Sequence, residues 1–144
     1  MSENKKVLKN KTIIAAWIQK TEDDLSFAKD AFADTEYYDH ICVLAQQAVE
    51  KYLKASIILG KGFLSKKERV HNLIYLSNLC KNYGLNLDRF EENLRRLSEA
   101  YIPARYPIGN LIKFTKKEAQ MCLNDAKEII GFIKRKINLS VYFK

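Results

Sequence analysis

Proline and glycine are scarce in this chain, whose 144 residues include two prolines and five glycines. Because these residues end helices and form tight turns, their scarcity predicts few turns and long elements. A hydrophobic content of 47% and a charged content of 29% favour a globular fold over disorder. No apolar run approaches the length of a membrane span, and no signal peptide is recognisable. We therefore expect a single domain over residues 1–144, with its core at about 12–137, in the cytoplasm.

Cysteine and histidine are too few and too scattered to suggest a metal site. Cys42, Cys80 and Cys122 lie far apart in apolar surroundings, and the only histidines are His40 and His71. We expect three reduced, buried thiols, no metal and no cofactor. The chain also has no glycine-rich phosphate loop, no G-x-S-x-G and no H-E-x-x-H motif.

The charge is basic and unevenly placed, with a net charge of +8 and a pI of about 9.3. Acids concentrate between Glu22 and Asp39, whereas lysines dominate the first twenty residues and the segment from Lys113 onward. A basic balance is compatible with a phosphate-bearing partner, and equally with a protein that uses charge only to stay in solution.

Helical spacing of apolar residues predicts five helices. They span about 12–33, 37–59, 71–84, 87–101 and 115–137. Gly60 is the expected C-terminal cap of the second helix, and Thr115 with Glu118 forms a capping box that starts the fifth. The polar residues 1–11 are expected to fray. Short connections between the helices predict an all-α fold, a five-helix up-and-down bundle.

The second helix, ICVLAQQAVEKYLKASIILG, is apolar over more than half of its circumference. A surface helix needs an apolar stripe of only about 100°, so this helix either lies at the centre of the bundle or meets another subunit. Its polar side chains share a wedge of about 140°. They are Gln46, Gln47, Glu50, Lys51 and Lys54. This wedge is either a solvated face with i,i+4 contacts, such as Gln47–Lys51 and Glu50–Lys54, or the lining of a dimer cleft.

The stretch YIPARYP, residues 101–107, holds both prolines and is expected to interrupt the helix. Arg105 lies between Tyr101 and Tyr106 in a backbone that the prolines restrict. In one interpretation the guanidinium binds backbone carbonyls at the end of the fourth helix. In the other it binds a phosphate, for which its planar fork is suited, and the tyrosines stack on a base.

Two further groups of polar residues have alternative interpretations. His71, which begins the third helix after the basic loop FLSKKERV, is either a helix-start residue or a substitute acid or base. Asp23 and Asp24 follow Thr21 in a T-x-x-D pattern. This pattern predicts favourable charges at a helix N-terminus and only weakly indicates a paired-carboxylate site.

Three segments in this order resemble the HEPN domain, a small helical domain named for nucleotide binding in higher eukaryotes and prokaryotes. They are AQQAVEKYLKASIILGKG, HNLIYLSNLC and YIPARYP, and the resemblance covers about residues 14–135. It implies a bundle of four or five helices that usually forms a homodimer. Stand-alone prokaryotic members often pair with a minimal nucleotidyltransferase in toxin–antitoxin systems. We take as candidates for nucleotide or RNA phosphate contact Arg105, Tyr106, Tyr101, Lys51, Lys54, Gln47 and His71.

Many HEPN proteins are metal-independent ribonucleases, in which an arginine is followed after four to six residues by a histidine. In this chain the corresponding positions after Arg105 are Asn110, Leu111 and Ile112. An arginine supplies a cation for phosphate but no acid or base near neutral pH. We therefore favour a non-catalytic nucleotide- or RNA-associated module that pairs with a minimal nucleotidyltransferase in a toxin–antitoxin-type system. The alternatives are a metal-independent ribonuclease toxin with an atypical site and a purely structural role in a complex.

Overall fold

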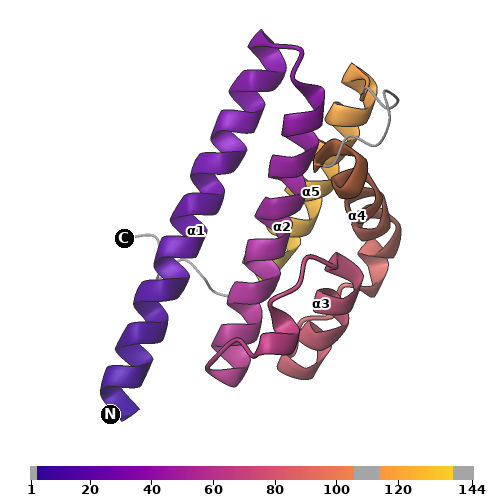
Figure 1. The fold of residues 1–144 in the computed structure, drawn as a ribbon. Helices are drawn as coiled ribbons and strands as arrows, with labels where there is room; N and C mark the ends of the chain where they lie inside the picture. The colour runs from indigo at the N-terminus through magenta and orange to yellow at the C-terminus, as the bar shows by residue number, and fades with distance from the viewer. Residues whose placement is uncertain (1–2, 106–113, 138–144) are drawn as a thin grey trace.

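The computed structural model describes residues 3–105 and 114–137, with side chains described for 11–100 and 114–137. These residues form five α-helices, three short 3-10 turns and no strand, which confirms the predicted all-α bundle (Figure 1). The helices are α1 (Glu3–Asp34), α2 (Tyr38–Lys61), α3 (Leu73–Cys80), α4 (Glu91–Arg105) and α5 (Lys116–Lys136). The 3-10 turns span Lys66–Glu68, Lys81–Tyr83 and Asp88–Phe90.

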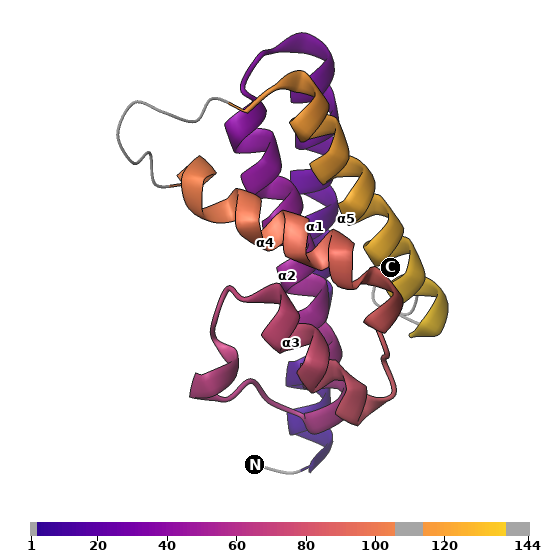
Figure 2. The same cartoon turned by 90° about the vertical axis from the view of Figure 1, so that its right-hand side faces the viewer.

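The helix α2 is the centre of the bundle. It packs against α1, α3, α4 and α5, and α4 crosses it obliquely (Figures 1 and 2). Most of its residues are buried, among them Tyr52, Leu53 and Ile57, which have no exposed surface. The wide apolar circumference is thus covered by helices of the same chain. The central-helix interpretation is the one that the structure shows, and this helix alone no longer argues for a second subunit.

The first helix is longer than predicted. It begins at Glu3 instead of residue 12, because the polar start is rich in lysine and contains no proline or glycine, so it favours a helix without an apolar stripe. Thr21 and Asp24 therefore lie in the middle of α1, and the predicted capping role of Asp23 and Asp24 is wrong. Thr21 is buried, and the carboxylate of Asp24 instead contacts α2.

The second helix ends two residues later than predicted. The cap is Gly62, whose φ of 95° is left-handed and whose N–H donates to the carbonyl of Ile58 at 2.8 Å. Gly60 is needed for a different reason, since a Cβ at this position would collide with the ring of Tyr83. This close approach joins the end of α2 to the turn that follows α3.

The fourth helix continues through Pro103 to Arg105, so the expected break at YIPARYP is wrong for residues 101–105. Proline fixes φ at a value that a helix accepts, although it removes one i→i−4 hydrogen bond and so weakens the helix at this position. Residues 106–113 lie outside the described residues. Thr115 and Glu118 form the predicted capping box, with the Thr115 hydroxyl accepting from the Glu118 N–H at 3.1 Å.

All three cysteines are buried and free, as predicted. The thiol of Cys80 donates to the carbonyl of Leu53 at 3.5 Å, and burial raises its pKa to about 12. The neighbouring Cys122 thiol and burial raise the pKa of Cys42 as well. The thiols of Cys80 and Cys42 are therefore protonated at neutral pH and poor nucleophiles. No helix in the described ranges combines the length and apolarity needed to cross a membrane.

Candidate functional site

Part of the polar wedge of α2 is buried, which contradicts the interpretation of the whole wedge as a solvated face. Gln46, Glu50 and Lys54 are 0%, 7% and 8% exposed. They follow one another at i,i+4 spacing and therefore share one side of the helix. The segment that enters α3 covers this side, because the Gln46 amide donates to the backbone carbonyl of His71 at 3.0 Å.

The Glu50 carboxylate is the centre of this buried cluster. One of its oxygens lies 2.8 Å from Nδ1 of His71 and accepts from the Gln46 amide at 3.3 Å. Its other oxygen accepts from Nζ of Lys54 at 3.1 Å. A buried carboxylate is costly unless charge and hydrogen bonds compensate it, and here three groups do so. We call these four residues the Glu50 cluster: Gln46, Glu50, Lys54 and His71.

His71 is the member of the cluster that reaches the surface, with a side chain that is 62% exposed. It lies two residues before α3, which begins at Leu73 and not at His71 as predicted, and the next residue, Asn72, caps the helix by accepting the N–H of Tyr75 at 3.0 Å. Gln46 fixes the backbone of His71 and Glu50 orients its ring. An imidazole oriented by a carboxylate is suited to proton transfer, and the same contacts also anchor α3 on α2.

Lys51 does not join this cluster. Its amine lies 2.9 Å from the carboxylate of Asp24 on α1, so the pair connects the first two helices. Gln47 is half-buried on α2. The predicted set of Lys51, Lys54 and Gln47 therefore does not converge on one site, although the predicted Glu50–Lys54 pair is confirmed.

Arg105 and Tyr101 lie in the last two turns of α4, and Tyr106 lies outside the described residues. The C-terminal end of α4 and the loop between α2 and α3 are on the same side of the molecule in Figure 2. The phosphate contact expected at Arg105 stays a prediction.

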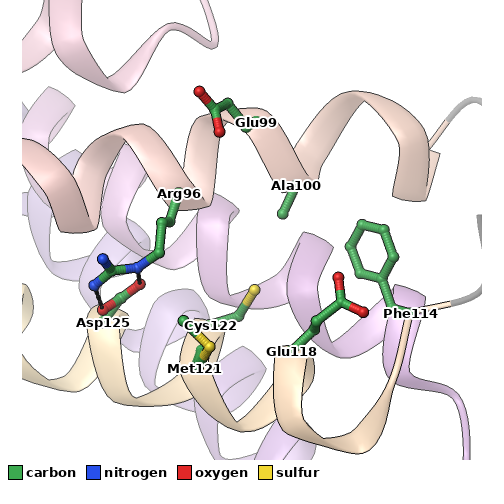
Figure 3. A pocket seen from close by; sticks show the side chains of 8 residues that line it. All are labelled: Arg96, Glu99, Ala100, Phe114, Glu118, Met121, Cys122 and Asp125. Carbon is green, nitrogen blue, oxygen red and sulfur yellow. Dashed lines mark hydrogen bonds and ion pairs between the residues drawn. The ribbon is translucent and has the colours of Figure 1, made fainter.

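A cavity of about 290 Å³ opens between α4 and α5 (Figure 3). Ala100, Phe114, Met121 and Cys122 give it an apolar lining. The only cation among its described lining residues is Arg96.

The charges around this cavity do not suit a phosphate. The guanidinium of Arg96 binds the buried carboxylate of Asp125 at 2.8 and 3.0 Å, and this contact raises the pKa of Arg96. Glu99 and Glu118 also line the cavity and add negative charge. A phosphate would therefore meet a neutralised arginine and two carboxylates, so the lining of this cavity is unsuited to a phosphate.

Sequence reasoning placed Gln46 and Glu50 in the polar wedge but did not choose them as site residues. The signal was their spacing with Lys54, which puts all three on one stripe of an otherwise apolar helix. What covers that stripe depends on where α3 packs.

Among the described residues, no three His, Cys, Asp or Glu side chains are grouped so that they could hold a metal ion.

Comparison with known proteins agrees with the fold. The profile of the family described as "HEPN domain" matches residues 14–136. A protein of Methanocaldococcus jannaschii named "Putative toxin MJ1304" is 30% identical over 129 residues, which cover 82% of this chain and 84% of the relative. The crystal structure of TT1696 from Thermus thermophilus superposes with a TM-score of 0.68 at 25% identity, covering 88% of this chain and 99% of that one. The structure of ST0689, described as an archaeal HEPN homologue, gives a TM-score of 0.63 at 28% identity, with coverage of 85% and 95%.

Proposed function

This chain belongs to the HEPN domain family, and we propose that it is the HEPN member of a toxin–antitoxin-type pair that associates with nucleotide or RNA without cleaving it. The toxin name of the Methanocaldococcus relative supports the toxin–antitoxin setting. The family match over residues 14–136 and the helical bundle support the assignment of the whole core to one HEPN unit.

The sequence after Arg105 is the observation that supports a non-catalytic role. The positions that would hold the histidine of the ribonuclease pattern are Asn110, Leu111 and Ile112. Their side chains are an amide and two hydrocarbons, and none of these titrates near neutral pH. Arg105 at the end of α4 supplies a guanidinium for the proposed phosphate contact. The imidazole that would transfer a proton is missing at this spacing.

The proposed protein partner is a minimal nucleotidyltransferase, and the proposed assembly is a homodimer of HEPN subunits. A groove between the end of α1 and the start of α2 supports the homodimer. Phe27, Tyr37, Val43 and Leu44 line it, and Phe27 and Tyr37 are 64% and 66% exposed. Large exposed rings around an apolar groove are typical of a surface that a partner covers, and a second copy of the chain would cover it.

A binding measurement tests the role of Arg105. Fluorescence anisotropy with a labelled oligouridylate should show binding by the wild-type protein and a loss of about tenfold or more in Arg105→Ala. Arg105→Lys should recover only part of this loss, since lysine has no bidentate fork. Arg95→Ala is the matched control, because Arg95 is exposed on the same helix and pairs with Glu91 and Glu92. Equal binding by the wild type and Arg105→Ala would overturn the proposed phosphate contact.

A second candidate function is a ribonuclease with an atypical site. The contact of 2.8 Å between Glu50 and His71 favours it, because it supplies an oriented imidazole on the surface. In this case His71 would act as the acid or base and Arg105 would bind the phosphate. His71→Asn would then abolish RNA cleavage in the absence of metal. Cleavage that is unchanged in His71→Asn would exclude this role.

A further inference from the structure

The loop between α2 and α3 presents its positive charges to solvent and hides its negative charge. We call residues 62–72 the basic loop. Phe63, Lys66, Lys67 and Arg69 are exposed, whereas Glu68 is the one buried residue of the segment, at 4% exposure. The Lys-Lys-Glu-Arg run therefore presents its three cations to solvent and not its carboxylate.

Glu68 is held inside by three contacts. Its two carboxylate oxygens lie 2.9 and 3.0 Å from Nζ of Lys61, and one of them accepts the N–H of Ser65 at 2.7 Å. Ser65 and Glu68 form a capping box around the 3-10 turn Lys66–Glu68. Burial alone would raise the pKa of Glu68, but the contacts with Ser65 and Lys61 outweigh it and lower the pKa. The carboxylate is therefore ionised, and the turn above it is fixed.

An exposed ring lies beside the same turn. Nζ of Lys61, which binds Glu68, also lies 4.5 Å from the centre of the Phe63 ring, so the ring and the turn share one anchor. Phe63 is 51% exposed. Within the described residues, Lys66, Lys67 and Arg69 make no ion pair with a carboxylate. Their charge is thus available to a ligand.

We propose that the basic loop is a binding surface for single-stranded nucleic acid, with Lys66, Lys67 and Arg69 at phosphates and Phe63 stacked on a base. A single strand fits this surface better than a duplex, because a base must be unstacked to reach an exposed ring. The fixed turn lowers the entropy that binding would otherwise lose. The proposed contact residues do not include Arg105, so the inference does not depend on the phosphate contact proposed there.

Two variants with the same net charge test the surface. Lys66→Gln, Lys67→Gln and Arg69→Gln together lower the net charge from +8 to +5, a loss of three charges. The control replaces three lysines that are exposed on α1 and α5 by Gln: Lys29, Lys117 and Lys127. It gives the same change in net charge, from +8 to +5. Both triple variants change exposed side chains only, and their melting temperatures should match that of the wild type.

The probes are labelled oligouridylate and oligothymidylate, titrated at several salt concentrations. The loop variant should bind at least about tenfold more weakly, and its salt slope should fall by about two, since each phosphate contact on a single strand contributes about 0.7. The control variant should stay within about threefold of the wild type. Phe63→Leu should weaken binding by about tenfold through lost stacking. Tighter binding of one probe would show whether the surface prefers RNA or DNA, and either preference would support the proposed binding surface.

Other results would overturn the inference. Equal losses in the two triple variants would mean that net charge alone attracts the probe. Competition by polyglutamate as strong as that by unlabelled oligouridylate, together with unchanged binding of Phe63→Leu, would indicate an acidic protein as the ligand. Lack of binding by the wild type would also contradict the surface. If Arg105→Ala loses binding and the loop variant does not, the inference fails while the proposed function stands. If the loop variant loses binding and Arg105→Ala does not, the basic loop is supported as the binding surface and the proposed role of Arg105 is overturned.

Photocrosslinking of the wild-type protein gives a test that needs no variant. Irradiation with oligouridylate followed by mass spectrometry should place crosslinked peptides within residues 62–72. Crosslinks found only elsewhere in the chain would contradict the basic loop as the contact surface.

Discussion

Glu50 on α2 and His71 at the start of α3 are joined by a contact of 2.8 Å between a carboxylate oxygen and Nδ1. They are 21 residues apart in sequence, and the contact connects a buried charge to an exposed ring. The same carboxylate also holds Lys54. Glu50 therefore links the core of the bundle to the one histidine that the sequence offered as an acid or base.

The first prediction concerns the charge balance of this cluster. Glu50→Ala should lower the free energy of unfolding by about 3 kcal/mol, because it leaves the buried Lys54 without its carboxylate. Adding Lys54→Met should recover part of this loss, since the stranded charge is then removed. Urea unfolding at neutral pH measures both. Glu92→Ala on the exposed face of α4 is the control, with an expected loss below about 1 kcal/mol. A loss in Glu50→Ala no larger than that of the control would mean that the cluster is not coupled as described.

The second prediction uses the lowered pKa of Glu68. A folded-state pKa below the usual 4.5 means that the carboxylate stabilises the fold fully above the pKa of the unfolded chain. This contribution is lost as the pH falls below 4.5 toward the folded-state pKa. Glu68→Gln should therefore be less stable than the wild type at about pH 7, and the difference should shrink in acid. Urea unfolding over this pH range measures it. A difference that is constant with pH would contradict the ionised, buried carboxylate.

The third prediction separates two glycines. Gly60→Ala should destabilise the protein by about 1 to 3 kcal/mol, because the new Cβ would collide with the ring of Tyr83. Gly131→Ala should instead be neutral or stabilising by up to about 1 kcal/mol, since it lies inside α5 and its nearest neighbour is the flexible end of Arg135 at 3.4 Å. Thermal unfolding compares the two. If Gly60→Ala is as stable as the wild type, the close approach at Gly60 is not as described.

The fourth prediction concerns assembly. Light scattering should give twice the chain mass of 16.7 kDa for the wild type. Phe27→Glu should give a monomer, because it places a charge in the apolar groove between α1 and α2. Phe63→Glu changes an exposed ring on a different surface and should leave the mass unchanged. A wild-type monomer at micromolar concentration would remove the homodimer, and a dimeric Phe27→Glu variant would place the interface elsewhere.

The helices were predictable where local signals decide them. The capping box of Thr115 and Glu118 marks the start of α5 because both partners lie within one turn. The ends of α2 and α4 were predicted wrongly because the local signals for ending and for continuing a helix compete there. Gly60 and Gly62 are both suitable caps by type, and only the contact with Tyr83 shows that Gly60 has another role. Pro103 signals a break because it removes one backbone hydrogen bond, yet its fixed φ is compatible with a helix and α4 continues through it to Arg105.

The candidate site was less predictable than the fold. Periodicity placed Gln46, Glu50 and Lys54 on one side of α2, but a helical wheel does not show what packs on that side. Only the position of α3 shows that His71 covers it. Likewise, the burial of Glu68 in the basic loop depends on Lys61, seven residues away across the end of α2. The contact of Arg105 with phosphate and the span of a single domain over residues 1–144 stay predictions.

The most direct test of the central claim is a time course of RNA incubated with the purified protein without added metal, run on a denaturing gel beside Arg105→Ala. The proposed function predicts that the RNA stays intact in both samples, while the wild type alone retains it in the binding assay. Cleavage by the wild type that disappears in Arg105→Ala would contradict the claim. The protein would then be a ribonuclease, and His71 would be the first residue to test as its acid or base.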